Sequence, residues 1–166
     1  NPSRFDPPEF DVWELDIGTD ENGTEWFKRY KIKNIKQLHD FDNELMVKHK
    51  DWFESLLMLP FENVRPLTYS LSMTKYNKTC YLEDHTDSSR ERRLSLIYHT
   101  SKIYSILCGG ELLWYGGIGR NKFSPSYNTL YLFMPNEYTE HGISYTRCSE
   151  RTAISGWIES KPSSLY

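Results

Sequence analysis

Alternation of apolar and polar residues is the feature that most limits the folds open to this chain. Residues 67–74 read LTYSLSMT, so every second side chain from Leu67 to Met73 is apolar. Successive side chains of a β-strand point to opposite faces, so the pattern predicts a strand with one buried and one more polar face. Glycine and proline separate further segments of strand character, at residues 93–100, 111–115, 129–134, 141–146 and 152–158. Residues from about 65 onward are therefore predicted to form an antiparallel barrel or jelly roll.

The N-terminal third of the chain has a different pattern. Apolar residues between 34 and 59 recur about every 3.6 positions, which predicts helix, with Asn34 as N-cap, a second helix from Asp51 and an end at Pro60. An Asp-Glu-Asn-Gly turn at 20–23 predicts a hairpin joining residues 12–15 to 25–27. The fold class is thus α+β in a single domain over 1–166, with N-terminal helical support at 1–64 and the β-core at 65–160.

Composition narrows the classes of function. The net charge is −3 and no basic stripe is present, so we expect no nucleic-acid partner. No apolar run reaches the roughly 18 residues of a membrane span, so we expect no membrane partner. The three cysteines have no CxxC spacing, which favours reduced thiols and a cytoplasmic location. Aromatic residues make up 15%, which suits either an aromatic-lined cleft or simply a sheet-rich core.

Two histidines and a carboxylate suggest a metal site. His85 and Asp87 are separated by one residue, so on an extended segment both side chains point the same way. His141 lies far enough downstream to return on another strand and complete a two-histidine, one-carboxylate triad, which is typical of non-haem Fe(II). Arg151, ten residues after His141, could bind a carboxylate beside that metal. Each element alone has a simpler explanation: a chance HxD, a turn histidine, or a surface ion pair. His39 and His49 are expected on a helix surface.

In this order the motifs resemble those of a known family, the prolyl-hydroxylase branch of the Fe(II)- and 2-oxoglutarate-dependent dioxygenases. The resemblance covers residues 73–158, about half of the chain. The segments that carry it are Tyr76 with Tyr81-Leu82 and His85-Thr86-Asp87, then 92–98 (RRLSLIY), 108–112 (CGGEL), 128–133 (NTLYLF) and 151–158 (RTAISGWI).

This resemblance implies a fold, cofactors and roles for individual residues. It implies a double-stranded β-helix (jelly-roll) core with N-terminal helices packed on one sheet. It implies Fe(II) on His85, Asp87 and His141, and 2-oxoglutarate with its distal carboxylate paired to Arg151. Dioxygen is the second co-substrate, and ascorbate is a candidate reductant. It further implies Tyr76 in the co-substrate pocket, with Trp157 and Arg92 on the substrate side.

Two positions depart from the family pattern. Thr79 stands where the family usually has glycine, so the turn after Tyr76 is expected to be reshaped. His99 stands where the family often has a tyrosine that contacts the distal carboxylate of 2-oxoglutarate. A histidine could replace that hydrogen bond, or it could be a core residue without a role in binding.

The resemblance also implies an activity, hydroxylation of a C–H bond, most readily in a prolyl residue of a protein or peptide. The same chemistry on a free amino acid or another small molecule is one alternative. A non-catalytic jelly roll that binds a metal or ligand is another, while the acidic balance disfavours a nucleic-acid demethylase. Trp114, Tyr115 and Trp157 could surround a pyrrolidine ring, and the loop at 116–126 could be a mobile lid or only a hairpin connection.

Overall fold

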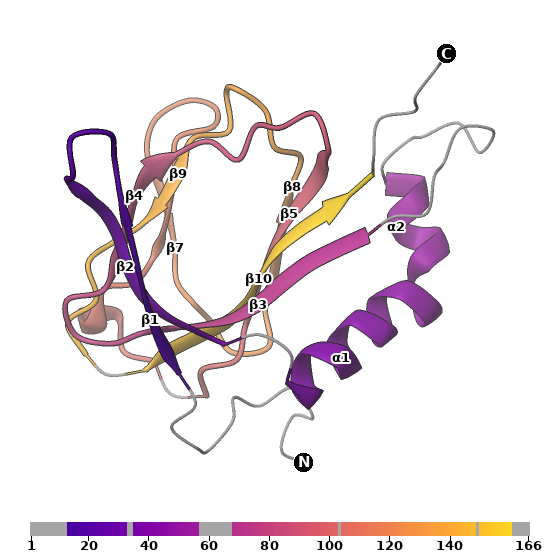
Figure 1. The fold of residues 1–166 in the computed structure, drawn as a ribbon, viewed down its shortest axis with the longest axis horizontal. Helices are drawn as coiled ribbons and strands as arrows, with labels where there is room; N and C mark the ends of the chain where they lie inside the picture. Colours follow the sequence, from indigo (N-terminus) through magenta and orange to yellow (C-terminus); the bar gives the residue numbers. More distant parts are fainter. Residues whose placement is uncertain (1–12, 33–34, 57–67, 103, 149, 161–166) are drawn as a thin grey trace.

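A computed structural model describes residues 13–32, 35–56, 68–102, 104–148 and 150–160. Its ten strands form one sheet in which every described pairing is antiparallel, in the order β7-β6-β9-β4-β2-β3-β10-β5-β8 with β1 beside β2. The sheet curls so that β4 and β9 lie across from β5 and β8, as a jelly roll requires (Figure 1). The strands are β1 (Glu14–Thr19), β2 (Glu25–Ile32), β3 (Thr68–Tyr76), β4 (Tyr81–His85), β5 (Arg92–His99), β6 (Leu112–Trp114), β7 (Asn121–Phe123), β8 (Leu130–Phe133), β9 (His141–Ile143) and β10 (Arg151–Glu159).

The alternation in β3 separates two environments. Met73, which is fully buried, belongs to the main hydrophobic cluster, and Tyr69 and Leu71 pack against that cluster. Ser70, Ser72, Thr74 and Tyr76 line a cavity on the other side, which Leu71 also borders. β3 pairs with β10 along its whole length, from Tyr76 opposite Arg151 to Thr68 opposite Glu159. The predicted strand is therefore confirmed, and it serves as the wall between the core and the cavity.

The predicted helical region is helical over most of the residues that the structure describes there. It consists of α1 (Lys36–Asn43), one π-helical turn at Glu44–Lys48, and α2 (Lys50–Leu56). Its apolar spacing buries Leu38, Phe41, Leu45 and Phe53 in the same cluster as Met73, as Figure 1 shows for α1 beside β3. His39 and His49 are exposed, as predicted. Asn34 and Pro60 lie outside the described residues. None of the described helices has the length and apolarity that a membrane span needs.

The described part of residues 1–64 contributes strands to the sheet as well as helices. β1 and β2 form the expected hairpin, and β2 then pairs with both β3 and β4, so it belongs to the sheet. Asp20 organises the turn, because its carboxylate accepts hydrogen bonds from the backbone N–H groups of Asn22 and Thr24 at 2.8 and 2.9 Å. Cross-strand pairing of two amphipathic segments explains why this part of the chain is extended.

The turn after Tyr76 keeps a conformation that suits glycine although threonine occupies it. Thr79 has φ +73°, in the left-handed region that β-branched residues rarely adopt. Its backbone N–H donates to the carbonyl of Thr146 at 3.0 Å, and its hydroxyl accepts from Lys28 at 3.3 Å. The expected reshaping of the turn is therefore not seen at this residue; its hydrogen bonds to two other segments stabilise an unfavourable φ instead.

Cys108 and Cys148 form a disulfide, so the prediction of three reduced thiols is wrong for two of them. Their Cα atoms lie 4.9 Å apart although 40 residues separate them in sequence. Pairing of β6 with β9 brings the two segments together, and the N–H of Arg147 donates to the carbonyl of Cys108 at 2.7 Å. Cys80 is a free, buried thiol. Spacing along the sequence could not indicate this bond, because it depends on which strands pair.

Loss of the disulfide should reduce stability measurably. For a loop of this length we expect the Cys108→Ser/Cys148→Ser variant to lose about 2–4 kcal/mol of unfolding free energy, since the unfolded chain gains freedom. Urea unfolding with and without dithiothreitol measures the effect. The reductant should shift the wild-type midpoint and leave that of the double variant unchanged. A wild-type midpoint that does not respond to full reduction would contradict this expectation.

Candidate metal centre

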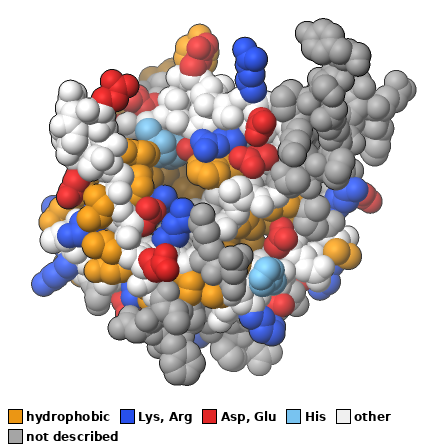
Figure 2. Space-filling model, viewed as in Figure 1, with side chains coloured by type: hydrophobic (Ala, Val, Ile, Leu, Met, Phe, Trp, Pro, Cys, Tyr) orange, Lys and Arg blue, Asp and Glu red, His pale blue; other side chains and the backbone are white. Residues whose placement is uncertain are grey.

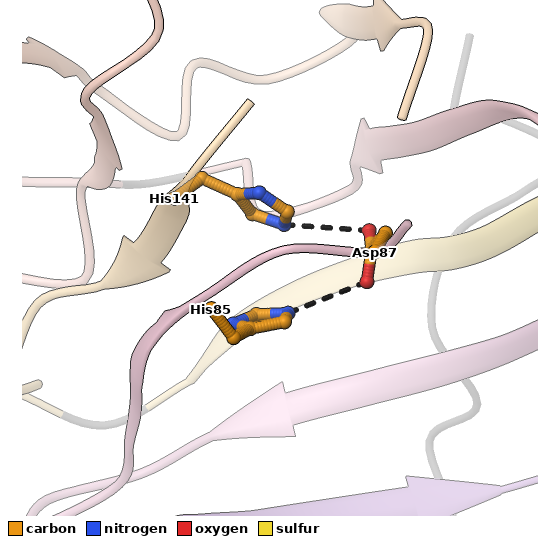
Figure 3. A group of neighbouring side chains, drawn as sticks. All are labelled: His85, Asp87 and His141. Carbon is orange, nitrogen blue, oxygen red and sulfur yellow. Dashed lines mark ion pairs between the residues drawn. The ribbon is translucent and has the colours of Figure 1, made fainter. Parts of the chain in front are cut away.

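Two strand ends and the loop after one of them bring His85, Asp87 and His141 together. His85 ends β4 and His141 begins β9, and the two residues are direct cross-strand partners, with ring centroids 4.5 Å apart. Asp87 follows His85 by two residues and turns its carboxylate toward both rings (Figure 3). Its Oδ1 lies 3.4 Å from Nε2 of His85 and its Oδ2 lies 3.4 Å from Nε2 of His141. The predicted convergence of these residues is confirmed.

The donor atoms of this triad suit a metal ion. One ligand atom from each residue lies within 4.8 Å of the other two. Nδ1 of His85 lies 2.9 Å from the carbonyl of Glu83, and Nδ1 of His141 lies 3.0 Å from the carbonyl of Thr139. Nδ1–H donation to these carbonyls leaves Nε2, the atom that faces Asp87, as the nitrogen that gives up its proton when a metal binds. Two imidazole nitrogens and one carboxylate on one side of a site are the ligand set of non-haem Fe(II).

The surroundings of Asp87 keep its carboxylate ionised. The residue is only 6% exposed. Burial alone would raise the pKa of Asp87, but hydrogen bonds with His141 and His85 and one from Ser95 outweigh it and hold the pKa far below the usual range. Burial also opposes protonation of His85, yet Asp87 and the Glu83 carbonyl leave the pKa of His85 raised. These surroundings thus favour an ionised Asp87 carboxylate that faces two imidazole rings. A metal cation can take the place of the protons on the Nε2 atoms of those rings.

Ser95 is a further residue of this site that the sequence did not reveal. Its buried hydroxyl donates to Oδ2 of Asp87 at 2.8 Å. We predict that Ser95→Ala weakens metal binding by roughly 10- to 100-fold with little change in fold, because hydrogen bonds to metal ligands orient them. Ser155→Ala, in the same cavity wall on β10, is the matched control. Titration with Co(II) measures both variants, and equal affinities for the two would contradict the role of Ser95.

The triad opens into a cavity of about 190 Å³. Its wall also includes Tyr76, Arg151 and Trp157. Figure 2 shows the hollow on this face of the molecule, with histidine, basic and hydrophobic side chains around it. Three of the residues predicted around the metal therefore share one cavity with it, whereas Arg92 and His99 are not among its lining residues.

Arg151 is a buried cation with an unsatisfied donor. It is 3% exposed, its Nε donates to the carbonyl of Gly110 at 2.7 Å, and its guanidinium carbon lies 4.9 Å from the ring centroid of Tyr76. Its Nη2 is buried and has no hydrogen-bond partner among the described residues. Burial lowers the pKa of Arg151, although Tyr76, Tyr104 and Tyr131 oppose that change. A buried charge without a partner is costly, so this geometry suits an anionic ligand in the cavity.

The glycine at position 110 makes the placement of Arg151 possible. A Cβ atom at Gly110 would lie 2.9 Å from Cδ of Arg151, and the residue has φ +72°. The preceding residue, Gly109, accepts a hydrogen bond from the hydroxyl of Tyr104 through its carbonyl. Glycine at position 110 therefore lets the backbone approach the Arg151 side chain closely and accept its hydrogen bond.

His99 is an uncharged core residue in this structure. It is fully buried, neither ring nitrogen has a hydrogen-bond partner among the described residues, and its ring lies edge-on to Tyr131 at 5.5 Å. Burial, with a smaller contribution from Arg151, lowers the pKa of His99 to about 2. Its partner in the sheet is Ala153, two residues from Arg151. Its predicted contact with a co-substrate stays a prediction.

Arg92 and Trp157 form one unit next to the metal ligands. The guanidinium carbon of Arg92 lies 3.5 Å from the ring centroid of Trp157. Its Nη1 donates to the backbone carbonyl of Asp87 at 3.3 Å and lies 3.7 Å from Oδ1 of that residue. Arg92 therefore contacts the metal-ligand segment and Trp157 forms part of the cavity wall. Their predicted roles toward a substrate stay predictions.

Of the three aromatic residues predicted to surround a substrate ring, only Trp157 lines the cavity. Trp114 stacks with His141 at 6.3 Å and lies edge-on to Phe133 at 4.9 Å, so it packs behind a metal ligand and is not among the cavity-lining residues. The segment after Trp114 connects β6 to β7, which pair as a hairpin. The simpler interpretation of this loop, a hairpin connection, matches the structure.

Two basic residues in the cavity wall, Arg29 and Lys31 of β2, had not been predicted as site residues. In sequence they look like ordinary charges on a strand near the N-terminus. One feature of the sequence could have linked them: Arg29 and Lys31 are two residues apart, so on a strand both side chains lie on the same face as Phe27.

Comparison with solved structures shows the same fold at low sequence identity. A Pseudomonas putida prolyl-4-hydroxylase has a TM-score of 0.65 and 12% identity, with 89% of this chain and 79% of that chain covered. An oxidoreductase of the 2OG-Fe(II) oxygenase family from Burkholderia pseudomallei has a TM-score of 0.66 and 17% identity, covering 90% and 73%. A Trichoplax adhaerens prolyl hydroxylase in complex with a hypoxia inducible factor oxygen degradation domain peptide fragment has a TM-score of 0.62 and 16% identity, covering 89% and 71%.

Sequence comparison identifies the family. No curated protein matches the sequence. The profile of the 2OG-Fe(II) oxygenase superfamily matches residues 71–159, which is more than half of the chain and includes both the triad and Arg151. The chain therefore belongs to the 2OG-Fe(II) oxygenase superfamily, whose cofactors are Fe(II) and 2-oxoglutarate, and His85, Asp87 and His141 could hold the iron.

Proposed function

We propose that this protein is a dioxygenase that hydroxylates a C–H bond of a prolyl residue in a protein or peptide. The observation that carries the reaction class is the shared cavity of the His85–Asp87–His141 triad and a buried arginine whose Nη2 lacks a partner among the described residues. Support for a prolyl substrate comes from the structural neighbours, two of which are named prolyl hydroxylases. One of them binds a peptide, which supports a peptide or protein as the substrate here.

Each site residue has a proposed role. His85, Asp87 and His141 hold Fe(II), and Ser95 fixes the orientation of the carboxylate. Arg151 pairs with the distal carboxylate of 2-oxoglutarate, which satisfies its unpaired Nη2, and Tyr76 lines the same pocket beside it. His99 is buried and its pKa is lowered, so it adds no positive charge of its own beside Arg151. Trp157 walls the substrate side, and Arg92 holds it against the Asp87 segment.

Fe(II) with 2-oxoglutarate supplies, when bound, the oxidising chemistry that puts one oxygen atom of O2 into succinate and the other into the substrate, with release of CO2. The chain's own residues keep the reacting groups in place. Asp87 and Arg151 are themselves buried, so water screens the charged contacts of these two side chains only weakly. We further propose that residues 1–166 act as one domain. A cytoplasmic location stays a prediction, and its basis in reduced cysteines now holds for Cys80 alone.

Mass spectrometry of candidate proteins and peptides tests the proposal. Incubation with the protein, Fe(II), 2-oxoglutarate and O2 should add the mass of one oxygen atom at a proline, and succinate should form in equal amount. The His85→Ala variant is the control and should produce neither. If oxygen is added to a free amino acid or another small molecule instead, the reaction class holds and the prolyl-peptide assignment fails. If metal binds but no succinate forms with any substrate, the protein is a non-catalytic metal-binding jelly roll.

A further inference from the structure

The hairpin of β1 and β2 contributes two cations to the cavity. Arg29 and Lys31 alternate along β2 with Lys28 and Tyr30, and only the first pair lines the cavity. Lys28 donates instead to Thr79, and Tyr30 lies under the ammonium of Lys75. In the ladder between β2 and β3, Lys31 pairs with Thr74 and Tyr30 pairs with Lys75, so Arg29 comes next to Tyr76. Arg29 and Arg151 therefore lie on the two strands that flank Tyr76.

The carboxylate of Asp16, outside the cavity wall, contacts both cations. Nε of Arg29 donates to Oδ2 of Asp16 at 3.0 Å, and Nζ of Lys31 lies 3.9 Å from the same oxygen. Asp16 faces Arg29 directly across the hairpin. Phe27 supports the guanidinium of Arg29, whose carbon lies 4.7 Å from the ring centroid. The Arg29 side chain is only 19% exposed, so it is held in place at the wall rather than extended into solvent.

The charges of the cavity leave a role for Arg29 and Lys31. The two positive charges of Fe(II) balance the two negative charges of 2-oxoglutarate, and among the wall residues Arg151 balances Asp87. Arg29 and Lys31 are two further cations of the wall, and Asp16, which contacts both, is not among the lining residues. In a partly buried cavity, fixed cations favour a ligand with a negative charge over its neutral analogue.

We propose that Arg29 and Lys31 form the anion-binding subsite for the substrate, so that the substrate carries a carboxylate close to the C–H bond that is hydroxylated. This inference rests on the proposed function, which supplies the reaction and assigns Arg151 to the co-substrate. The carboxylate has two sources with the same chemistry: the main-chain carboxylate of an amino acid or chain end, or an Asp or Glu side chain beside the target residue in a peptide.

Binding of matched probe pairs tests the subsite. The protein is loaded with Mn(II) and 2-oxoglutarate, so that binding is measured without turnover, and calorimetry follows two pairs of probes. The first is L-proline against L-prolinamide; the second is an end-blocked prolyl peptide with Glu against Gln beside the proline. We expect the acidic member of at least one pair to bind roughly ten-fold tighter or more, since charge-assisted hydrogen bonds are strong. The pair that shows the preference identifies the source of the carboxylate.

Two single-charge variants of β2 provide the comparison. Arg29→Met should bring the ratio of affinities within that pair close to one. Lys28→Met removes the same charge from the neighbouring position, outside the cavity wall, and should leave the ratio unchanged. The same variants are titrated with 2-oxoglutarate, for which Arg29→Met should have much less effect than Arg151→Met.

Three results would overturn the subsite. One is equal binding, or absence of binding, for both members of both pairs. Another is a preference that survives Arg29→Met. A third is an Arg29→Met variant that loses 2-oxoglutarate as strongly as Arg151→Met does, which would place Arg29 in the co-substrate site. Failure of the proposed function looks different, because the wild-type protein would then not bind metal and 2-oxoglutarate together.

Discussion

Substitution of His85 by alanine should abolish stoichiometric Fe(II) binding and, with it, all oxygenase activity. The variant loses one of the three ligand atoms that lie within 4.8 Å of each other, and Asp87 loses one of its two imidazole partners. Changes to residues that only support metal ligands weaken binding by about 10- to 100-fold, so loss of a ligand should exceed that range. Anaerobic titration with Fe(II), read by metal analysis after desalting, measures the effect.

The exposed His49, between the π-helical turn and α2, provides the matched control for His85→Ala. His49→Ala removes the same side chain from a position far from the triad in sequence and without a contact to it, and should bind one Fe(II) as the wild type does. Circular dichroism of both variants establishes that they are folded. A folded His85→Ala protein that retains wild-type affinity for Fe(II) would contradict the assignment of the triad.

Substitution of Arg151 by methionine should separate co-substrate binding from stability. We expect the dissociation constant for 2-oxoglutarate to rise roughly 100-fold, equivalent to about 3 kcal/mol, because a buried charged contact is lost. The protein without co-substrate should be at least as stable as the wild type. Methionine removes a buried charge whose Nη2 has no described partner, and this gain outweighs the lost hydrogen bond to Gly110. Metal binding should be unchanged.

Calorimetry and thermal unfolding, each with and without 2-oxoglutarate, measure these effects. Arg93→Met is the control, because the Nε of Arg93 donates to Ser160, away from the cavity. In the wild type and in Arg93→Met, 2-oxoglutarate with metal should raise the unfolding temperature. In Arg151→Met the increase should be lost at the same ligand concentration. A strongly destabilised Arg151→Met protein that still binds 2-oxoglutarate tightly would show that the arginine is structural.

The sequence predicted those parts of the site that local geometry determines. The HxD spacing places His85 and Asp87 on one side of an extended segment whatever the rest of the fold does. The alternation in residues 67–74 likewise determines which face of β3 meets the core and which meets the cavity. His141 and Arg151 could be assigned to the site because their order along the chain matches a known family. The β4–β9 pairing then places His141 beside His85, and the β3–β10 pairing places Arg151 beside Tyr76.

Contacts that depend on strand pairing could not be predicted in this way. The Cys108–Cys148 bond requires β6 to lie beside β9. Ser95 reaches Asp87 because the metal-ligand segment follows β4 and leads to β5 on the other side of the curled sheet. Arg29 joins the cavity because β2 pairs with β3, although the N-terminal third had been expected to act mainly as helical support. At Thr79 the sequence predicted a change that did not occur. Hydrogen bonds with Lys28 and Thr146 retain a turn whose positive φ threonine disfavours.

Optical titration under anaerobic conditions shows whether one cavity holds Fe(II) and 2-oxoglutarate side by side. Addition of both to the wild-type protein should produce a weak visible charge-transfer band that neither produces alone. The His85→Ala variant should give no band, and Arg151→Met should need a much higher concentration of 2-oxoglutarate to reach it. If calorimetry shows that the wild type binds both ligands and no band develops, Fe(II) and 2-oxoglutarate do not meet at the triad, and the assignment of His85, Asp87, His141 and Arg151 to one site is wrong.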